Sequence, residues 1–263
     1  MRILSFSFET TLQFSDPVSE HSFVLRCLPK SCASQTVLDS QIIITPHTTV
    51  AAQVDGFGNL LQVGRIAEPH SEFNFISSGM VVVDTENCSA EPAHPMFLRD
   101  SSFAATSGAI RTFAADALRV ACNAPAWDKA MKLSHALHEH LSYKPGATDV
   151  STTAAEAFEL GCGVCQDYAH ILIAACRTEG ICARYVNGLI VGEGATHAWV
   201  EVHDGDHWRG IDPTHDCAVT DEYIALSRGR DFSDCAIESG VFRGGAQQSQ
   251  NVIVHVVDQA SRL

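Results

Sequence analysis

The sequence predicts an α+β fold in two parts, an N-terminal antiparallel β-sandwich followed by a core of helices packed on an antiparallel sheet. Three observations support this prediction. The first third of the chain alternates apolar and polar residues between frequent turn signals. A segment with two prolines, TENCSAEPAHP, then interrupts the pattern. Beyond it, stretches with helical periodicity come first and strand-like runs follow.

The N-terminal part is expected to contain short strands over residues 3–84. Leu4, Phe6 and Phe8 alternate with polar residues, as on a strand that buries one face. The apolar runs QIIIT and MVVVD indicate further strands. Turn signals separate the runs at Asp16-Pro17, Thr45-Pro46 and DGFGN. We therefore expect a β domain over residues 1–84 and a linker over residues 85–100.

The remaining residues, 101–263, are expected to form a second domain that includes the strands at the C-terminal end. Helical patterns cover residues 113–121 and 127–141. Thr153 and Glu156 have the spacing of a capping box, which predicts a short helix after them. Strand-like runs return over residues 181–191 and continue in a hairpin.

The run GCGVCQDYAHILIAACRTEG places Cys165 at the start of an apolar helix. A helix that is apolar all round is buried, so only its end can meet solvent or substrate. Gly180 marks the C-terminal end of this helix, with Arg177 in the last turn. Cys165 is thus expected at the N-terminus, where unpaired N–H groups and the helix dipole favour a thiolate and can receive an oxyanion.

The run THAWVEVHDGDHWRGIDP predicts a β-hairpin that carries His197 and Asp212. If Asp204-Gly205 forms a two-residue loop, His197 and Asp212 oppose each other directly across the strands. If the loop is Gly205-Asp206, they are diagonal neighbours on one face, and a loop of odd length would separate them. On one face, Asp212 can fix the tautomer of the imidazole and leave its second nitrogen for the thiol. A nucleophile, a base and an orienting carboxylate are the parts that a thiol acyl-transfer enzyme needs.

The same residues belong to three segments in a specific order, GVCQDYAHILIAACRTEGICARYVNG, THAWVEV and IDPTHD. In type, spacing and order these segments resemble the bacterial transglutaminase-like cysteine peptidase family. The segments FETTLQFSDPVSEHSFVLRCLP, DGFGN and EPHSEF resemble the family's N-terminal β domain, and GVFRGGAQQ with VIVHVVD resembles its last strands. The resemblance covers nearly the whole chain. It implies a papain-like, transglutaminase-like core with Cys165 as nucleophile, His197 as general base and acid, and Asp212 as the residue that orients His197.

Two departures from the family pattern concern the oxyanion site. Gln166 stands where animal transglutaminases have a tryptophan after the nucleophile, and no glutamine precedes Cys165 at the distance used by papain-type peptidases. Gln166 and Trp199 are the candidate oxyanion-site or substrate-cleft residues. Trp199 lies two residues after His197 and so shares its face, although core packing explains it equally well. Hydrolysis is therefore favoured over cross-linking as the default activity.

Three classes of function remain open. The leading hypothesis is a cysteine hydrolase that cleaves amide bonds of a protein or peptide through a thioester intermediate. The second is a protein-glutamine acyltransferase, a true transglutaminase, in which an amine intercepts the same thioester. The third is a binding module with a degenerate site. The first half-reaction is common to the first two classes, so the motif does not separate them.

Other reactive residues have simpler interpretations. Cys162 and Cys165 form a C-x-x-C, a pattern found in redox and zinc sites, but no second pair of ligands accompanies it. Cys162 is expected to pack, or to form a disulfide with Cys165 under oxidation. Asp167 is expected to stabilise the start of the helix, although its charge opposes a thiolate.

The remaining histidines near these motifs form two groups. One group lies in a single predicted helix, where a solvated or half-buried face is the simpler interpretation: His135, His138 and His140. The other group flanks the hairpin and is expected on its rim: His203, His207 and His215.

Composition excludes several other functions. The net charge of −14, from 31 acidic and 17 basic residues among 263, argues against nucleic acid as a partner. The opening MRILSFSFETTLQF lacks the apolar core of a secretory signal, and no stretch has the apolar length of a membrane span. Ten cysteines without an evident disulfide framework suit a reducing compartment, so a cytoplasmic location is expected. The predicted chemistry requires neither a metal nor another cofactor. The sequence contains no EF-hand loop, so calcium dependence is not expected. The oligomeric state is open.

Overall fold

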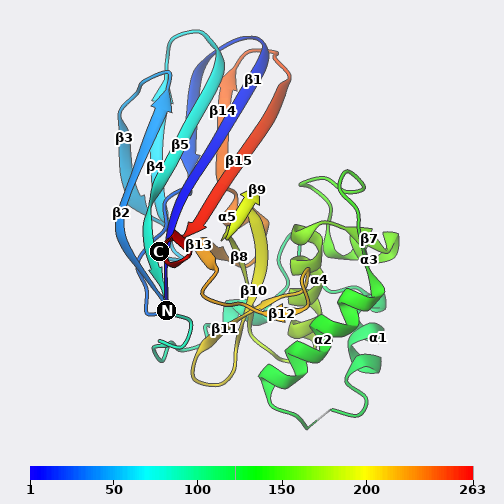
Figure 1. Cartoon of the computed structure of the whole chain (residues 1–263). Helices are drawn as coiled ribbons and strands as arrows, with labels where there is room; N and C mark the ends of the chain where they lie inside the picture. The colour runs from blue at the N-terminus through cyan, green and yellow to red at the C-terminus, as the bar shows by residue number, and fades with distance from the viewer. Residues whose placement is uncertain (122, 263) are drawn as a thin grey trace.

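The computed structural model describes residues 1–121 and 123–262, which form a β domain and a helical lobe on either side of a central sheet (Figure 1). The fold is therefore α+β, with mainly antiparallel strands, as predicted. The strands of the β domain are β1 (Arg2–Leu25), β2 (Gln35–Thr45), β3 (Val50–Val54), β4 (Leu60–Ile66), β5 (His70–Val83), β14 (Glu238–Arg243) and β15 (Gln248–Asp258).

Strand β1 belongs to both layers of the β domain. Its N-terminal half pairs with β5 and β15, and its C-terminal half pairs with β4 and β14. Between the halves the chain passes through Glu20, whose φ of 52° lies in the left-handed region. The residues expected to alternate into the interior are buried: Leu4, Phe6 and Phe8 are 0%, 4% and 1% exposed. The predicted sandwich is thus built around one long, bent strand.

The C-terminal strands β14 and β15 belong to the β domain, whereas the sequence predicts them in the second domain, over residues 101–263. β15 pairs with β1 from Phe14 to Leu4, and β14 pairs with the other half of β1. Val254 and Val256 of β15 lie in the same apolar cluster as the inward side chains of β1. Without β14 and β15, β1 would present an unpaired edge in both layers. The second part of the fold is therefore not a continuous unit over residues 101–263.

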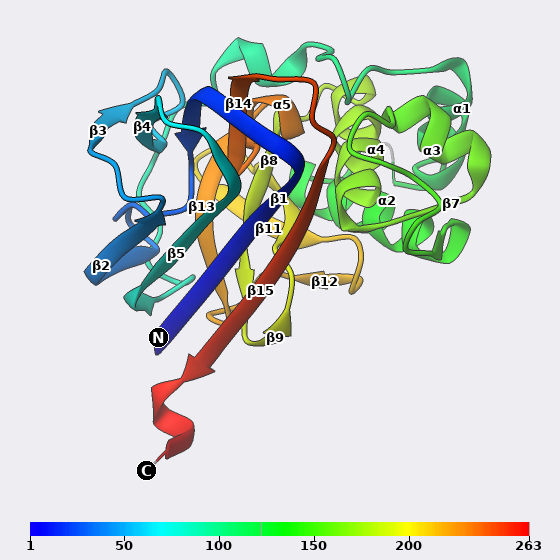
Figure 2. The ribbon, with the colours of Figure 1, turned by 90° about the horizontal axis from the view of Figure 1, so that it is seen from above.

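The central sheet has the strand order β12-β11-β10-β8-β13. Its strands are β8 (Ala183–Ile190), β10 (His197–His203), β11 (Trp208–Asp212), β12 (Cys217–Ala218) and β13 (Tyr223–Gly229), while the short β9 (Gly192–Gly194) pairs with β15. Helix α4 (Cys165–Thr178) covers one face of this sheet. The β domain covers the other, where Leu189, Ile224 and Leu226 share its apolar cluster (Figure 2). Burial on both faces agrees with β8 itself, in which every residue from Ala183 to Leu189 is buried.

The helical lobe packs around α4. Its other elements are α1 (Gly108–Ala117), α2 (Ala126–His140), α3 (Ala154–Leu160) and the short strands β6 (Ser142–Tyr143) and β7 (Cys162–Gly163). The helix expected over residues 113–121 begins and ends earlier, because the Ser107 side chain accepts the N–H of Ile110 at 3.2 Å and caps α1 there. The predicted capping box is confirmed: Thr153 N donates to Glu156 at 2.9 Å, and Glu156 N donates to Thr153 Oγ1 at 3.4 Å.

The segment between the β domain and the helical lobe is largely irregular and contains the 3₁₀ helix η1 (Pro95–Leu98). Arg177, near the end of α4, is buried and donates to the carbonyls of Phe97 at 3.2 Å and Ala104 at 3.4 Å. This guanidinium therefore fastens the end of the segment to α4. Two further short helices are α5 (Phe232–Cys235) and η2 (Gln259–Arg262).

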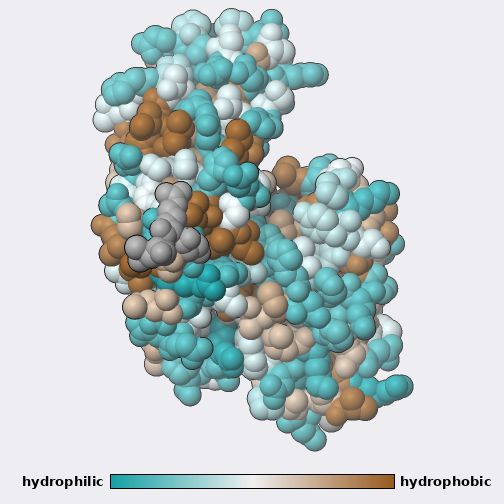
Figure 3. Space-filling model, viewed as in Figure 1, coloured by the Kyte–Doolittle hydropathy of each residue, from teal (hydrophilic) through white to brown (hydrophobic). Residues whose placement is uncertain are grey.

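The two lobes meet along a recess that is visible on the face shown in Figure 3, where the helical lobe carries mainly polar side chains. Among the residues described, no helix has both the length and the apolar character needed to cross a membrane.

Candidate active site

Helix α4 presents Cys165 as its first residue, as predicted. The helix is buried from Asp167 to Arg177, whereas Cys165 and Gln166 are half-buried. The first helical hydrogen bond is donated by Asp167 N to Val164 O at 2.9 Å. The N–H groups of Cys165 and Gln166 therefore precede the helical ladder, and they remain for a ligand beside the thiol at the positive end of the dipole.

Asp167 holds the turn that leads into Cys165. Its carboxylate accepts the N–H of Val164 and the hydroxyl of Thr148, both at 2.7 Å. A Cβ at Gly163 would lie 2.5 Å from Asp167 Oδ2, so only glycine allows this close approach. Burial raises the pKa of Asp167, against the opposite effect of these hydrogen bonds. The carboxylate caps α4, which is the role expected from the sequence.

His197 stands at the start of β10, with its imidazole between Cys165 and Asp212. Its Nε2 donates to Asp212 Oδ2 at 2.7 Å. Burial alone would lower the pKa of His197, but the hydrogen bond to Asp212 and the nearby Cys165 thiol outweigh it and raise the pKa to about 9. Since Nε2 faces the carboxylate, the nitrogen left for the thiol is Nδ1. The structure thus joins His197 to Asp212 by a hydrogen bond and places both near the Cys165 thiol.

The hairpin adopts the second of the two registers considered. Val200 pairs with Ile211 in β10–β11, so Asp212 continues opposite Trp199 and lies diagonal to His197. The loop residues are Gly205 and Asp206, not Asp204 and Gly205. The cause is the Asp204 carboxylate, which accepts the N–H groups of Asp206 at 3.1 Å and His207 at 3.0 Å. These bonds make Asp204 the first residue of the turn and not one of its central residues.

Asp212 is completely buried and holds more partners than the sequence suggested. Besides the His197 imidazole, its Oδ2 receives Nδ1 of His215 at 2.7 Å and the hydroxyl of Tyr223 at 2.9 Å. Its Oδ1 accepts the N–H groups of Thr214 at 2.9 Å and His215 at 3.2 Å. Burial opposes the charge, but the contacts with the two imidazoles lower the pKa of Asp212 below its usual range. His215 was expected only on the rim, and Tyr223 lay on a strand with no motif to single it out.

The two candidate oxyanion or cleft residues have other contacts. The Gln166 amide donates to the carbonyl of Val150 at 3.3 Å, which ties the start of α4 to the preceding loop. Trp199 is 2% exposed and packs edge-on against Tyr223, with ring centroids 5.4 Å apart. Its ring also lies near that of His197, with centroids 6.5 Å apart. Trp199 therefore packs behind His197 and does not form a wall of the cleft beside the thiol.

The site contains one group of side chains with metal-ligand chemistry. Within the described chain, ligand atoms of His197, Asp212 and His215 all lie within 4.8 Å of one another. Each imidazole nitrogen is 2.7 Å from the same carboxylate oxygen. Ligands of a tetrahedral zinc ion, with bonds of about 2.0 Å, would be roughly 3.3 Å apart. The observed spacing is that of hydrogen bonds, so this group is described as a hydrogen-bonded network.

The other histidines and Cys162 lie outside this network. His135 Nδ1 lies 2.6 Å from Asp216 Oδ2 and His138 Nδ1 lies 3.4 Å from Pro213 O, so both support the turn that follows Asp212. The third histidine of α2, His140, stacks on Phe158. Cys162 is a half-buried free thiol in β7.

The chain is similar to known proteins along nearly its whole length. It is 28% identical to an uncharacterized protein of Mycobacterium leprae, covering 92% of this chain and 94% of that protein. It is 26% identical to an uncharacterized protein of Mycobacterium tuberculosis, covering 91% and 87% respectively. The crystal structure of a protein from Cytophaga hutchinsonii, described as a putative cysteine protease, has a TM-score of 0.80 at 23% identity over 98% of this chain and 91% of that one. This likeness establishes the shared fold.

Two family matches cover the β domain and the core. Residues 4–82 match the bacterial transglutaminase-like N-terminal region. Residues 113–213 match the transglutaminase-like superfamily, and this range contains Cys165, His197 and Asp212. The chain thus carries a transglutaminase-like core and, ahead of it, the bacterial transglutaminase-like N-terminal region.

Proposed function

We propose that the protein is a thiol-dependent amide hydrolase that cleaves a protein or peptide substrate, with Cys165, His197 and Asp212 as its catalytic triad. The observation that carries this proposal is the His197 imidazole, which is hydrogen-bonded to buried Asp212 and whose pKa is raised in part by the nearby Cys165 thiol at the start of α4. A base held between a nucleophile and an orienting carboxylate is the arrangement that acyl transfer requires.

The proposed reaction proceeds through a thioester. His197 Nδ1 takes the proton of Cys165, and the imidazolium that forms is stabilised by Asp212. The thiolate attacks the amide carbon, and the oxyanion is received by the N–H groups of Cys165 and Gln166 at the start of α4. His197 then protonates the leaving amine, so the C–N bond breaks and a thioester remains. Water, deprotonated by His197, attacks this thioester and releases the carboxylic acid and the free thiol.

The second candidate, acyl transfer to an amine, shares every step up to the thioester. It is supported by the match to the transglutaminase-like superfamily. The two activities differ only in whether water or an amine attacks, so they are separated by the products and not by the site.

A peptide-library digest, followed by mass spectrometry, tests the proposal. We expect the wild-type chain to release new peptide ends and Cys165→Ala to release none. Cys162→Ala is the matched control, because it removes a neighbouring free thiol and is expected to keep the activity. Cleavage that persists in Cys165→Ala would refute the proposed nucleophile. A labelled primary amine added to the same digest shows whether water or an amine attacks the thioester. If the products are amine adducts and not hydrolysed ends, the activity is acyl transfer and the proposed hydrolysis is wrong.

A reducing compartment such as the cytoplasm is also proposed. The nine cysteines in the described part of the chain are all free thiols. Free thiols in this number persist where the cell keeps cysteine reduced.

A further inference from the structure

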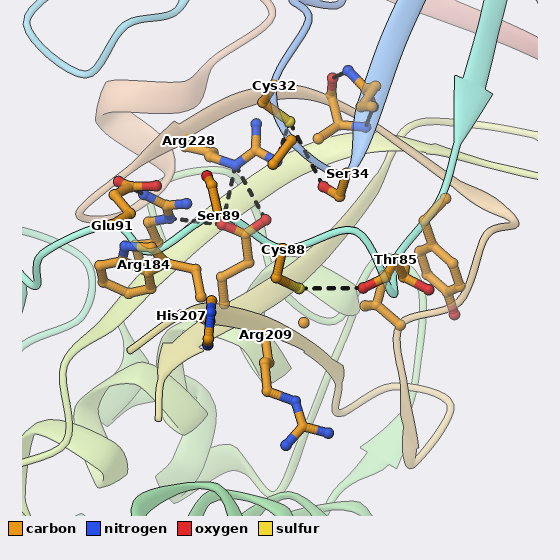
Figure 4. A pocket seen from close by; sticks show the side chains of 18 of the residues that line it. Cys32, Ser34, Thr85, Cys88, Ser89, Glu91, Arg184, His207, Arg209 and Arg228 are labelled. Atoms are coloured by element: carbon orange, nitrogen blue, oxygen red, sulfur yellow. Dashed lines mark hydrogen bonds and ion pairs between the residues drawn. The ribbon is translucent and has the colours of Figure 1, made fainter. Parts of the chain in front are cut away.

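A polar pocket of about 620 Å³ lies on the face of the central sheet that is turned toward the β domain. Its walls come from the β domain, from residues 85–89 and 91 of the linker, from Trp127 of α2, and from β8, β10, β11 and β13 (Figure 4). Neither Cys165 nor His197 is among the residues that line it. Trp199 and Tyr223 do line it, and on their other side they contact His197 and Asp212. The pocket is therefore separate from the thiol site but backs directly onto it.

Aromatic rings form a large part of the pocket walls. All three tryptophans of the chain line it: Trp127, Trp199 and Trp208. The Arg184 guanidinium lies over the Trp208 ring at 4.1 Å, and the Arg209 guanidinium lies over the Trp127 ring at 3.7 Å. Flat apolar rings beside cations suit an organic anion, since an inorganic ion would leave the rings against water. The volume is also that of a small-molecule site at a domain boundary.

A buried carboxylate in the wall, that of Glu201, is hydrogen-bonded to two arginines. Glu201 Oε2 accepts Nε of Arg184 at 2.6 Å, and both Glu201 oxygens accept Nε of Arg228 at 3.1 and 3.0 Å. Burial opposes the charge of Glu201, but the two guanidiniums outweigh it and lower its pKa to about 2. Glu201 therefore stays ionised, and its charge is matched by the two guanidinium groups.

The pocket wall also contains hydrogen-bond donors that lack a strong acceptor. The terminal Nη2 of Arg228 contacts only Cys32 Sγ, at 4.0 Å, among the described residues (Figure 4). The indole N–H of Trp208 is buried and, within the described chain, has no hydrogen-bond partner. The Arg228 side chain is 20% exposed, so a ligand with acceptor oxygens can take up the donor capacity of its Nη2.

One outer position on the wall is already held by a carboxylate. Glu91, on the linker, places Oε1 2.9 Å from Arg184 Nη1, and its side chain is 53% exposed. Its backbone is fixed separately, since Glu91 N donates to Asp206 O at 3.2 Å and His203 Nε2 donates to Glu91 O at 2.7 Å. A half-exposed ion pair of this kind contributes little stability. The Glu91 side chain can therefore separate from Arg184 while the backbone hydrogen bonds of the linker remain.

We propose that this pocket binds a small organic carboxylate, which takes the place of the Glu91 side chain on Arg184 and reaches the Nη2 donor of Arg228. The chemical class follows from Glu91, the resident carboxylate, and from the planar guanidinium groups, which match a carboxylate in two parallel hydrogen bonds. The aromatic walls hold the organic part of the ligand.

Intrinsic fluorescence tests this proposal directly, because every tryptophan of the chain lines the pocket. The full-length chain is titrated with N-acetyl-leucine, with the uncharged N-acetyl-leucinamide and with inorganic phosphate. We expect a saturable change with N-acetyl-leucine and none with the amide or with phosphate. This readout needs no enzymatic activity, so it stands or fails separately from the proposed hydrolysis.

Variants test the contacts. Glu91→Gln removes the resident competitor and is expected to tighten binding about threefold, the effect of losing a weak exposed ion pair. Glu159→Gln, an exposed residue of α3 that does not line the pocket, makes the same change of charge and is the control, expected to leave binding unchanged. Arg228→Lys is expected to weaken binding roughly tenfold, because it keeps a charge beside Glu201 but loses the guanidinium fork.

Several results would overturn the proposal. They are the absence of a saturable signal, binding of the amide or of phosphate as tight as that of the carboxylate, and equal affinity in wild type and Glu91→Gln. Should Arg228→Lys fail to fold, the Glu91→Gln comparison still decides, since Glu91 is a half-exposed side chain whose loss leaves the core intact.

Discussion

At the scale of single residues, the candidate site depends on how Asp212 divides its negative charge. One oxygen of Asp212 receives the imidazoles of His197 and His215 and the hydroxyl of Tyr223. Each donor stabilises the carboxylate and so weakens its attraction for the others. The pKa of His197 is therefore set by the whole group and not by Asp212 alone.

This balance predicts the alkaline limit of activity. Because the pKa of His197 is raised to about 9, we expect kcat/KM to fall on the alkaline side with an apparent pKa near 9, where His197 loses the proton it must give to the leaving amine. Asp212→Asn removes the charge that raises this pKa, so the limb should move to lower pH. Initial rates across the neutral and alkaline range measure both profiles. A limb at the same pH in the two proteins would contradict the assignment.

A second prediction concerns Tyr223, which sequence analysis did not single out. Tyr223→Phe keeps the ring but removes a buried donor at 2.9 Å from Asp212, so the free energy of unfolding should fall by about 1–3 kcal/mol. The less stabilised carboxylate should raise the pKa of His197 further and move the alkaline limb to higher pH. Tyr168→Phe is the matched control, because it loses a bond to Leu141 O, also at 2.9 Å, but none to Asp212. Denaturant unfolding and pH profiles of both variants decide, and a shared shift of the limb would argue for a general loosening.

At the scale of elements, the start of α4 combines a cap and a charge in one side chain. Asp167→Asn keeps an acceptor for the N–H of Val164 and removes the negative charge near the thiol, so alkylation of Cys165 by iodoacetamide should become faster at neutral pH with little loss of stability. Asp167→Ala loses the cap as well and should lower the free energy of unfolding by about 1–2 kcal/mol. Peptide mapping of the alkylated protein isolates Cys165 from the other thiols. Equal alkylation rates in wild type and Asp167→Asn would show that the carboxyl is already neutral.

The elements that could be predicted from sequence are those whose signals are local. The apolar helix after Cys165, the capping box at Thr153 and the hairpin itself all depend on residues within one turn of each other. The sequence is compatible with two hairpin loops, because both keep His197 and Asp212 on one face. In the structure the Asp204 carboxylate selects one of them by accepting two backbone N–H groups. Contacts between distant segments, such as Tyr223 with Asp212, have no local signal.

At the scale of the whole molecule, the β domain and the central sheet share one apolar core. Leu189 and Ile224 of the central sheet are buried in the same cluster as Phe6 of the β domain. Arg2 and Asp258, near opposite ends of the chain, form an ion pair at 2.7 Å. The division into a β domain over residues 1–84 and a later catalytic domain thus describes the sequence better than the fold, because the strands that complete the first part come last.

This sharing predicts a single unfolding transition. Heat or denaturant should unfold both lobes together, since separating them would expose the apolar residues that the central sheet buries against the β domain. Far-ultraviolet circular dichroism, which follows the strands and helices, and tryptophan fluorescence, which follows the pocket between the lobes, should give coincident midpoints. Two separated midpoints would show that the lobes are independently stable.

The pairing of β1 with β15 also has a consequence for biosynthesis. β1 leaves the ribosome early, but one of its two neighbours in the first layer is encoded more than two hundred residues later. Until that late segment emerges, the nascent β1 has an open edge and an uncovered row of phenylalanines. Closing so long a loop makes this step slow by comparison with local helix formation. The first strand to be made is therefore among the last to be completed, and the growing chain must stay soluble in the meantime.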